Sequence, residues 1–214
     1  MQAWRMVAVA GGVAAVLAGS VATASASAAH PATVRPMGVG YANSVAVATA
    51  IRSAPSSSTF YVGTAHPGDN VADICWIPGA DSGIWDLVLE RTGAGGDHFG
   101  NTVGYILEAD LRDGGQNQHT QCPAPGSAPG NSVNANTTMR SAPTTGAFAV
   151  GTAVPSDRLT LYCWIADGNN VPWDITVQEA GRGGDHLQYA ASMIPNSVVL
   201  AGVPGAAIPP CGQS

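Results

Sequence analysis

Two Asp-His pairs are the residues of this chain whose types and spacing could do chemistry. Asp97-His98 and Asp185-His186 each follow a pair of glycines. A histidine beside an acid can act as a general base or as a metal ligand. One His and one Asp are too few for a closed metal site, although a site shared by both pairs would have two of each. The competing interpretation, which we favour, is a glycine-rich turn whose polar tip bonds its own backbone.

Other catalytic patterns do not occur in the sequence. It has no Gly-x-Ser-x-Gly elbow and no phosphate-binding or dinucleotide-binding glycine motif. The cysteines lack the Cys-x-x-Cys spacing that is typical of zinc sites, and none has the features of a free nucleophile. We therefore expect no enzymatic activity, no metal and no cofactor.

The Asp-His pairs belong to a duplication that runs through most of the chain. The segment Ile51–Pro55 returns as Met139–Pro143, and Val62–Ala65 returns as Val150–Ala153, in each case 88 residues later. The two Asp-His pairs are also separated by 88 residues. This pattern predicts two copies of one structural unit. Duplicated surfaces favour binding over catalysis, because two weak sites on one chain gain avidity.

Each copy holds one early and one late cysteine. Cys75 and Cys122 lie in the first copy, and Cys163 and Cys211 lie in the second with almost the same separation. The symmetry of the repeat selects these two pairs from the three pairings that four cysteines allow. Each disulfide would close a long loop, which adds about 4 kcal/mol of stability in the chain-entropy model. Small units that bury little core commonly need such cross-links.

Short alternating runs separated by turn residues predict β-structure. Four such runs are Val71–Trp76, Trp85–Glu90 and their twins Leu159–Trp164 and Trp173–Gln178. In the first run, Val71, Asp73 and Cys75 are expected to share one face. No helical period of twelve residues follows the N-terminal segment. The sequence therefore predicts an all-β protein whose two small units are barrels or sandwiches.

The first 29 residues have the features of a secretion signal. Arg5 supplies a positive start, Met6–Leu17 is apolar, and Ala26-Ser27-Ala28 fits a cleavage site. Later apolar runs are too short to cross a membrane. We expect a secreted protein, and export makes oxidation of the cysteines feasible.

The remaining organisation follows from the repeat and from Pro- and Gly-rich segments. We expect a linker over 30–47, a first domain over 48–123, a linker over 124–135 and a second domain over 136–212. The net charge is −6, with eight basic residues against fourteen acids. Nucleic acid and anionic membranes both prefer basic surfaces, so neither is an expected partner.

The order of motifs in each copy resembles the bacterial Src-homology-3-type domain of exported and cell-envelope proteins. The first copy shows it at Ile51–Pro55, Val62–Thr64, Pro67–Asp69, Trp85–Val88 and Gly104–Ile106, and four of the five return in the second. The resemblance implies two tandem Src-homology-3-like β-barrels. Two departures are notable. Ala54 and Ala142 replace the usual glycine, so that turn must avoid positive φ. In addition, Met193 takes the place of Tyr105.

The resemblance also implies binding through a shallow aromatic groove. The candidates are Tyr61, Trp85, Tyr105 and Trp173. For Trp85 and Trp173, core packing is the favoured interpretation and groove lining the alternative, since aromatic side chains dominate cores as well as binding surfaces. Tyr61 and Tyr105 are favoured as groove residues because the second copy lacks an aromatic residue at their positions. The first copy is therefore the better candidate for the binder.

Arg52 and Arg140 occupy the opening motif of each copy. The structural interpretation is that they pair with Asp86 and Asp174 and so fix a turn. The functional alternative is capture of a ligand carboxylate.

Together these features predict a secreted, non-catalytic binding protein. The resemblance implies peptidoglycan, or a peptide of the cell envelope, as its partner. The alternative is a secreted structural or protein-interaction factor, such as an inhibitor or surface protein, that does not bind the wall.

Overall fold

The structure is a computed structural model. It describes residues 40–91, 98–114, 120–123, 131–180, 188–200 and 208–211. The predicted signal peptide, most of both predicted linkers, Asp97 and the pair Asp185-His186 lie outside these ranges. Within the described ranges, no helix has the length and apolar character needed to cross a membrane.

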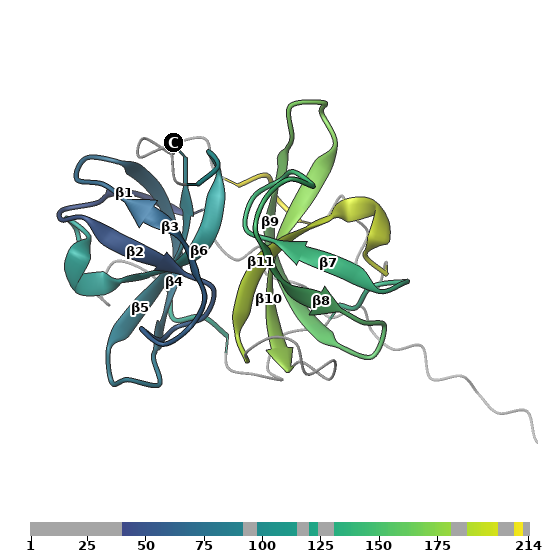
Figure 1. The fold of residues 1–214 in the computed structure, drawn as a ribbon, viewed down its shortest axis with the longest axis horizontal. Helices are drawn as coiled ribbons and strands as arrows, with labels where there is room; N and C mark the ends of the chain where they lie inside the picture. Colours follow the sequence, from purple (N-terminus) through teal and green to yellow (C-terminus); the bar gives the residue numbers. More distant parts are fainter. Residues whose placement is uncertain are drawn as a thin grey trace, which may run out of the picture. The chain divides into compact units, whose positions relative to one another are not determined.

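The first repeat forms one antiparallel sheet, drawn in blue to teal in Figure 1. Its strands are β1 (Tyr41–Ser44), β2 (Thr49–Arg52), β3 (Tyr61–Ala65), β4 (Asn70–Pro78), β5 (Ile84–Glu90) and β6 (Thr102–Leu107), followed by the 3-10 helix η1 (Glu108–Asp110). The strand order across the sheet is β1-β4-β5-β6-β2-β3. Most strands therefore pair with the next strand in the chain. The hairpin of β2 and β3 is the exception, because β2 pairs with β6 at the other end of the sheet from β1.

The second repeat builds the same sheet, drawn in green to yellow in Figure 1. Its strands are β7 (Thr137–Arg140), β8 (Ala149–Ala153), β9 (Arg158–Ala166), β10 (Pro172–Ala180) and β11 (Ala190–Pro195), followed by the 3-10 helix η2 (Asn196–Val198). The order β8-β7-β11-β10-β9 matches the first sheet, strand for strand, except for β1. The all-β class and the duplication are thus confirmed. Neither sheet closes on itself, so the barrels stay a prediction.

The end of the predicted first linker is a strand, which corrects the sequence interpretation. Tyr41–Ser44 forms β1 and pairs with β4 from Asn70 to Asp73. The second linker ends in the same way, because Asn131 forms an isolated bridge to Leu159 and Val133 is fully buried. Such short edge segments show no hydrophobic period, so their pairing with a neighbouring strand could not be seen in the sequence.

Both predicted disulfides are confirmed. Cys75 bonds Cys122 and Cys163 bonds Cys211, with sequence separations of 47 and 48 residues. Each bond joins a nine-residue strand, β4 or β9, to the segment that follows the sheet. The bend at Ala54 is also as expected, since neither Ala54 nor Ala142 has positive φ.

A β-bulge corrects the predicted faces of the long strand. The register of β4 against β5 shifts between Asp73 and Cys75, so strict alternation is broken there. Val71 consequently packs in one core cluster and Cys75 in the other. Cys163 is separated from Leu159 and Leu161 in the same way. The expected common face of Val71, Asp73 and Cys75 is therefore wrong.

Both faces of each sheet are buried. Val88 and Ile106 lie on the inner face of the first sheet, in a cluster with Ile51 and Val62. Leu87 and Leu89, which point the opposite way, lie in a cluster that also holds side chains of the second repeat. The repeat-two members are Tyr162, Cys163, Trp173, Ile175, Val177, Ala191, Met193 and Cys211. Burial of each such aliphatic side chain contributes about 1.5–3 kcal/mol.

The two repeats also exchange reciprocal backbone hydrogen bonds. Val103 N–H donates to the Ser141 carbonyl at 2.7 Å, and Ala191 N–H donates to the Ser53 carbonyl at 2.8 Å. Val103 is equivalent to Ala191, and Ser53 is equivalent to Ser141. Each repeat therefore donates one of the two bonds and accepts the other. The apolar face of each sheet is therefore covered by the other repeat, and this determines which predicted site residues reach the surface.

Candidate functional site

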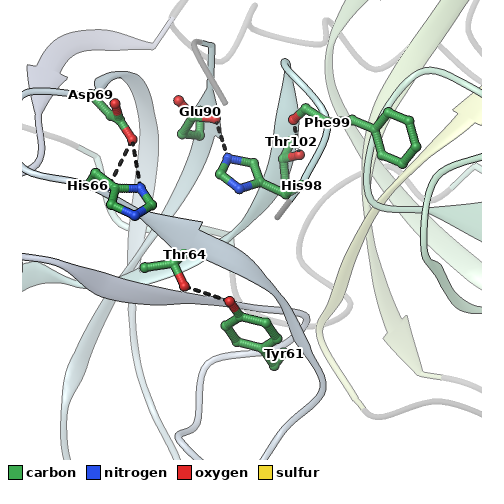
Figure 2. A network of polar contacts seen from close by, with 8 residues as sticks. All are labelled: Tyr61, Thr64, His66, Asp69, Glu90, His98, Phe99 and Thr102. Carbon is green, nitrogen blue, oxygen red and sulfur yellow. Dashed lines mark hydrogen bonds and ion pairs between the residues drawn. The ribbon is translucent and has the colours of Figure 1, made fainter. Parts of the chain in front are cut away.

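His98, from the first Asp-His pair, is buried and not at an exposed polar tip. Its Nε2 lies 2.8 Å from Glu90 Oε2, and the two side chains are 1% and 0% exposed. Figure 2 shows this pair pointing at one another, with His66 and Asp69 as a separate pair on the neighbouring turn. The ring of His98 also packs on β3, because a Cβ added to Gly63 would lie 2.5 Å from His98 Cβ. The pair fixes residues 98–101, which lead into β6, against the inner face of β5.

The described residues offer no metal centre. No group of three or more His, Cys, Asp or Glu side chains within them could hold an ion. The partner residues Asp97, Asp185 and His186 lie outside the described ranges, so a site shared by the two Asp-His pairs stays a hypothesis.

The four predicted groove aromatics are separated by the fold. Tyr61 is 47% exposed, whereas Trp85, Tyr105 and Trp173 are at most 5% exposed and belong to the cluster shared by the repeats. Tyr105 and Met193 are both fully buried at equivalent positions. That position therefore needs an apolar side chain of either kind. For Tyr105, the absence of an aromatic residue in repeat two was therefore not a sign of a binding role, whereas Tyr61 stays a prediction.

Both tryptophan rings are held at their indole N–H by a carboxylate in the preceding turn. Trp85 Nε1 donates to Asp81 Oδ1 at 3.0 Å, and Trp173 Nε1 donates to Asp167 Oδ2 at 3.4 Å. Asp81 and Asp167 are not equivalent positions of the duplication. The two repeats thus reach the same contact from different residues, which indicates that fixing the ring matters in both.

Arg52 and Arg140 do not pair with Asp86 and Asp174, which corrects the predicted ion pairs. Arg52 Nη1 donates to the Thr59 carbonyl at 3.0 Å, and Arg140 Nη1 donates to the Ala147 carbonyl at 3.0 Å. The arginines point away from the inner face, where the two aspartates lie. Each guanidinium therefore holds the turn between the first two strands of its motif, with further N–H groups left to donate elsewhere.

A polar groove lies beside Arg52 in repeat one, and we call it groove one. Its volume is about 480 Å³. The lining residues are Thr49, Ala50, Arg52, Ser57, Asp81, Gly83, Trp85, Leu107 and Asp110. Groove one therefore combines a half-buried guanidinium, two carboxylates and the edge of an indole. Ligand sites typically have this composition, in which a few well-placed polar groups surround an apolar surface.

The two carboxylates of groove one are fixed by hydrogen bonds. Asp81 Oδ2 accepts from the Ser57 N–H at 2.8 Å, and Asp110 Oδ2 accepts from Thr49 Oγ1 at 2.6 Å. The Ser57 N–H, together with the Trp85 indole, lowers the pKa of Asp81 to about 2. Asp81 is therefore ionised at neutral pH. A cationic ligand group would meet it without a change of protonation.

Repeat two lacks these charges at the equivalent positions. Asn169 stands where repeat one has Asp81, and Val198 stands where it has Asp110, while Arg140 keeps its place. Sequence reasoning identified Arg52 and Trp85 but missed Asp81, Asp110 and Thr49. A search for charge differences between the aligned copies would have found the two acids.

No protein-family model matches the chain, and no curated protein matches it either. The relationship to Src-homology-3-type domains thus rests on the motifs of the sequence alone. Function has to be argued from groove one and from the exposed aromatic residues.

Proposed function

We propose that the protein is an exported, non-catalytic binding protein made of two Src-homology-3-like units, and that groove one binds a short peptide of the cell wall. The two disulfides support export, because such bonds persist in oxidising compartments. The shared strand order of the two sheets supports tandem units of one kind.

The observation that carries the proposal is the placement of opposite charges in one groove. Arg52 can take a carboxylate, and Asp81 and Asp110 can take an ammonium group, on either side of the Trp85 edge. Wall peptides carry both a free carboxylate and amino groups. A chain with net charge −6 does not attract an anionic polymer as a whole, so recognition would depend on this local pairing.

A pull-down with purified peptidoglycan tests the proposal with a matched control. Arg52→Gln should lower binding about tenfold, because one charge-assisted contact contributes about 1.5–3 kcal/mol. Arg140→Gln removes the same arginine-to-carbonyl bond from repeat two, where Val198 stands in place of Asp110, and should leave binding unchanged. Equal losses in both variants, or no enrichment of the unmodified protein on peptidoglycan, would remove the wall-binding proposal.

A second candidate function is interaction with another secreted protein, and exposed aromatic residues favour it. All three phenylalanines of the chain are between 44% and 46% exposed. Phe60 and Phe148, at equivalent positions, have ring centroids 6.2 Å apart, and Phe99 lies next to Gly146. Clustered exposed apolar rings are typical of interaction surfaces. Loss of wall binding in the pull-down would leave this candidate standing.

A further inference from the structure

The inner face of the first sheet contains a carboxyl group with no hydrogen-bond partner. Asp86 is 0% exposed, and neither of its two side-chain oxygens has a hydrogen bond. Its neighbours on that face of β5 are Val88 and, across the strand pair, Ile106. An isolated ionised carboxylate is very unfavourable in such surroundings, whereas the protonated form carries no charge.

Two further carboxyl groups approach Asp86 from the elements packed on β5. Asp73 of β4 is opposite Val88 in register, so it lies on the same face as Asp86 and diagonal to it. Glu108 comes from η1, which packs against β5, and its Oε1 is buried without a hydrogen bond. Neither the His66–Asp69 pair nor the His98–Glu90 pair includes Asp86.

The other charged groups near this face are engaged elsewhere. Glu90 lies four residues further along β5 on the same face and contacts His98. Asp110 of η1 accepts a hydrogen bond from the Thr49 hydroxyl. The strand β6 contributes no charged residue to the face. The hydrogen bond from Asn43 Nδ2 to Asp73 Oδ2, at 3.3 Å, is the polar contact that ties the cluster to β1.

Repeat two shows what the same site looks like without the extra acids. Leu161 replaces Asp73, and Asn196 replaces Glu108. The remaining acid, Asp174, is 0% exposed and its Oδ2 accepts from Asn196 Nδ2 at 2.8 Å. One carboxyl with an amide donor therefore occupies the place where repeat one gathers three carboxyls.

We propose that Asp86 and Asp73, with Glu108 beside them, form a proton-binding site inside repeat one. The two aspartates hold protons at acidic pH and weaken repeat one when they lose them toward neutral and alkaline pH. The chemistry is reversible proton uptake by carboxyl groups, with water as the only other participant. The site makes the folded protein more stable at acidic pH, and it acts independently of groove one and its ligand.

The direction of the pKa shifts agrees with this geometry. Burial, and then the charges of Asp73 and Glu108, raise the pKa of Asp86 to about 8, and burial chiefly raises that of Asp73 to about 7. The unfolded chain loses these protons near pH 3.8. Between these pH values the folded state holds more protons, so stability is greatest at the acidic end and declines as pH rises toward 8.

Urea unfolding between pH 4.5 and pH 8.5, with the disulfides intact, tests the proposal. The unfolding constant of the unmodified protein should rise about tenfold or more between pH 5 and pH 8. Asp86→Asn should remove most of the rise above pH 6. Asp174→Asn, the matched control, should leave that part in place, because burial raises the pKa of Asp174 only to about 6. A constant or falling unfolding constant, or equal pH dependence in unmodified protein and Asp86→Asn, would overturn the site.

Direct titration keeps the proposal testable if Asp86→Asn fails to fold. Carbon-13 NMR of the side-chain carboxyls in the unmodified protein should give Asp86 a midpoint near pH 8 and Asp174 one near pH 6. A midpoint below pH 5 for Asp86 would overturn the proposal whatever the variants do.

Discussion

The two repeats share one backbone plan and fill its inner face with different polar groups. Glu90 pairs with His98 in repeat one, while the equivalent Gln178 donates to Asp157 Oδ2 at 2.5 Å in repeat two. Thr176 and Ser192 form a buried hydrogen bond of 2.9 Å where repeat one has Val88 and Gly104. These polar groups have hydrogen-bond partners, whereas both carboxyl oxygens of Asp86 in repeat one lack one.

The outer faces changed far less than the inner ones. Leu87 and Ile175, and likewise Leu89 and Val177, are equivalent, buried and apolar. Each outer face packs on the other repeat, so a polar substitution there would need a partner from a second part of the chain. On the inner face, a new polar residue can be satisfied by a neighbour in the same sheet, as Thr176 is by Ser192. The comparison teaches that the outer face of β5 and β10 keeps apolar residues in both copies, whereas the inner face accepts polar residues that find a partner.

Loss of a shared tryptophan tests whether the repeats fold as one. Trp85→Ala and Trp173→Ala should each cost about 3–5 kcal/mol, as large aromatic truncations in cores do. Because both rings lie in the cluster common to the two repeats, each variant should still unfold in a single transition. Tryptophan fluorescence and far-ultraviolet circular dichroism measured through the same urea titration check this. Two separate transitions would show that the repeats are energetically independent.

Exchanging the inner polar residue tests whether the two interiors are specific to their copies. Gln178→Glu should cost about 3 kcal/mol at pH 7, because a second buried carboxylate would face Asp157 in place of an amide donor. The reverse exchange, Glu90→Gln, should cost only about 1 kcal/mol, since an amide can still hydrogen-bond the His98 ring. Unfolding at pH 4.5 should recover much of the Gln178→Glu loss, as protonation removes the like charge. Similar losses for both exchanges would contradict the comparison.

The smallest expected effect concerns the carboxylate that holds Trp85. Asp81→Asn should cost less than about 1 kcal/mol, because the group is exposed to solvent. The lowered pKa of Asp81 gives its contribution a pH range: it is present above about pH 4 and is lost as pH falls toward 2. Thermal unfolding of the variant and the unmodified protein should converge at pH 2 and differ at pH 6. A difference that stays the same at both pH values would mean that the charge of Asp81 is not involved.

Much of the fold could be predicted from the sequence. The repeat determined the pairing of Cys75 with Cys122, and the alternation from Trp173 to Val177 identified a strand correctly. Alternation tells which residues share a face but not what covers that face. Trp173 and Tyr105 were therefore expected at a groove, although the cluster shared by the two repeats buries both side chains. The bulge after Asp73 was invisible for a related reason, because it depends on the partner strand.

The candidate site was less predictable than the fold. Arg52 and Trp85 were found through their motif, but the grouping of Thr49, Asp81 and Asp110 depends on the crossing of β2 to β6. The expected pairing of Arg52 with Asp86 failed because those residues face opposite sides of the sheet. Which residues are neighbours across two strands depends on the register of those strands, and a short sequence motif does not encode the register.

The reciprocal bonds Val103–Ser141 and Ala191–Ser53 give the chain the symmetry of a dimer whose two subunits have been tied end to end. A tied dimer keeps its halves together at any dilution, whereas free halves would separate. Either repeat produced alone would expose Leu87 or its counterpart Ile175 to water. Such a half-length protein should therefore associate with a second copy of itself through the surface that the linked partner now covers.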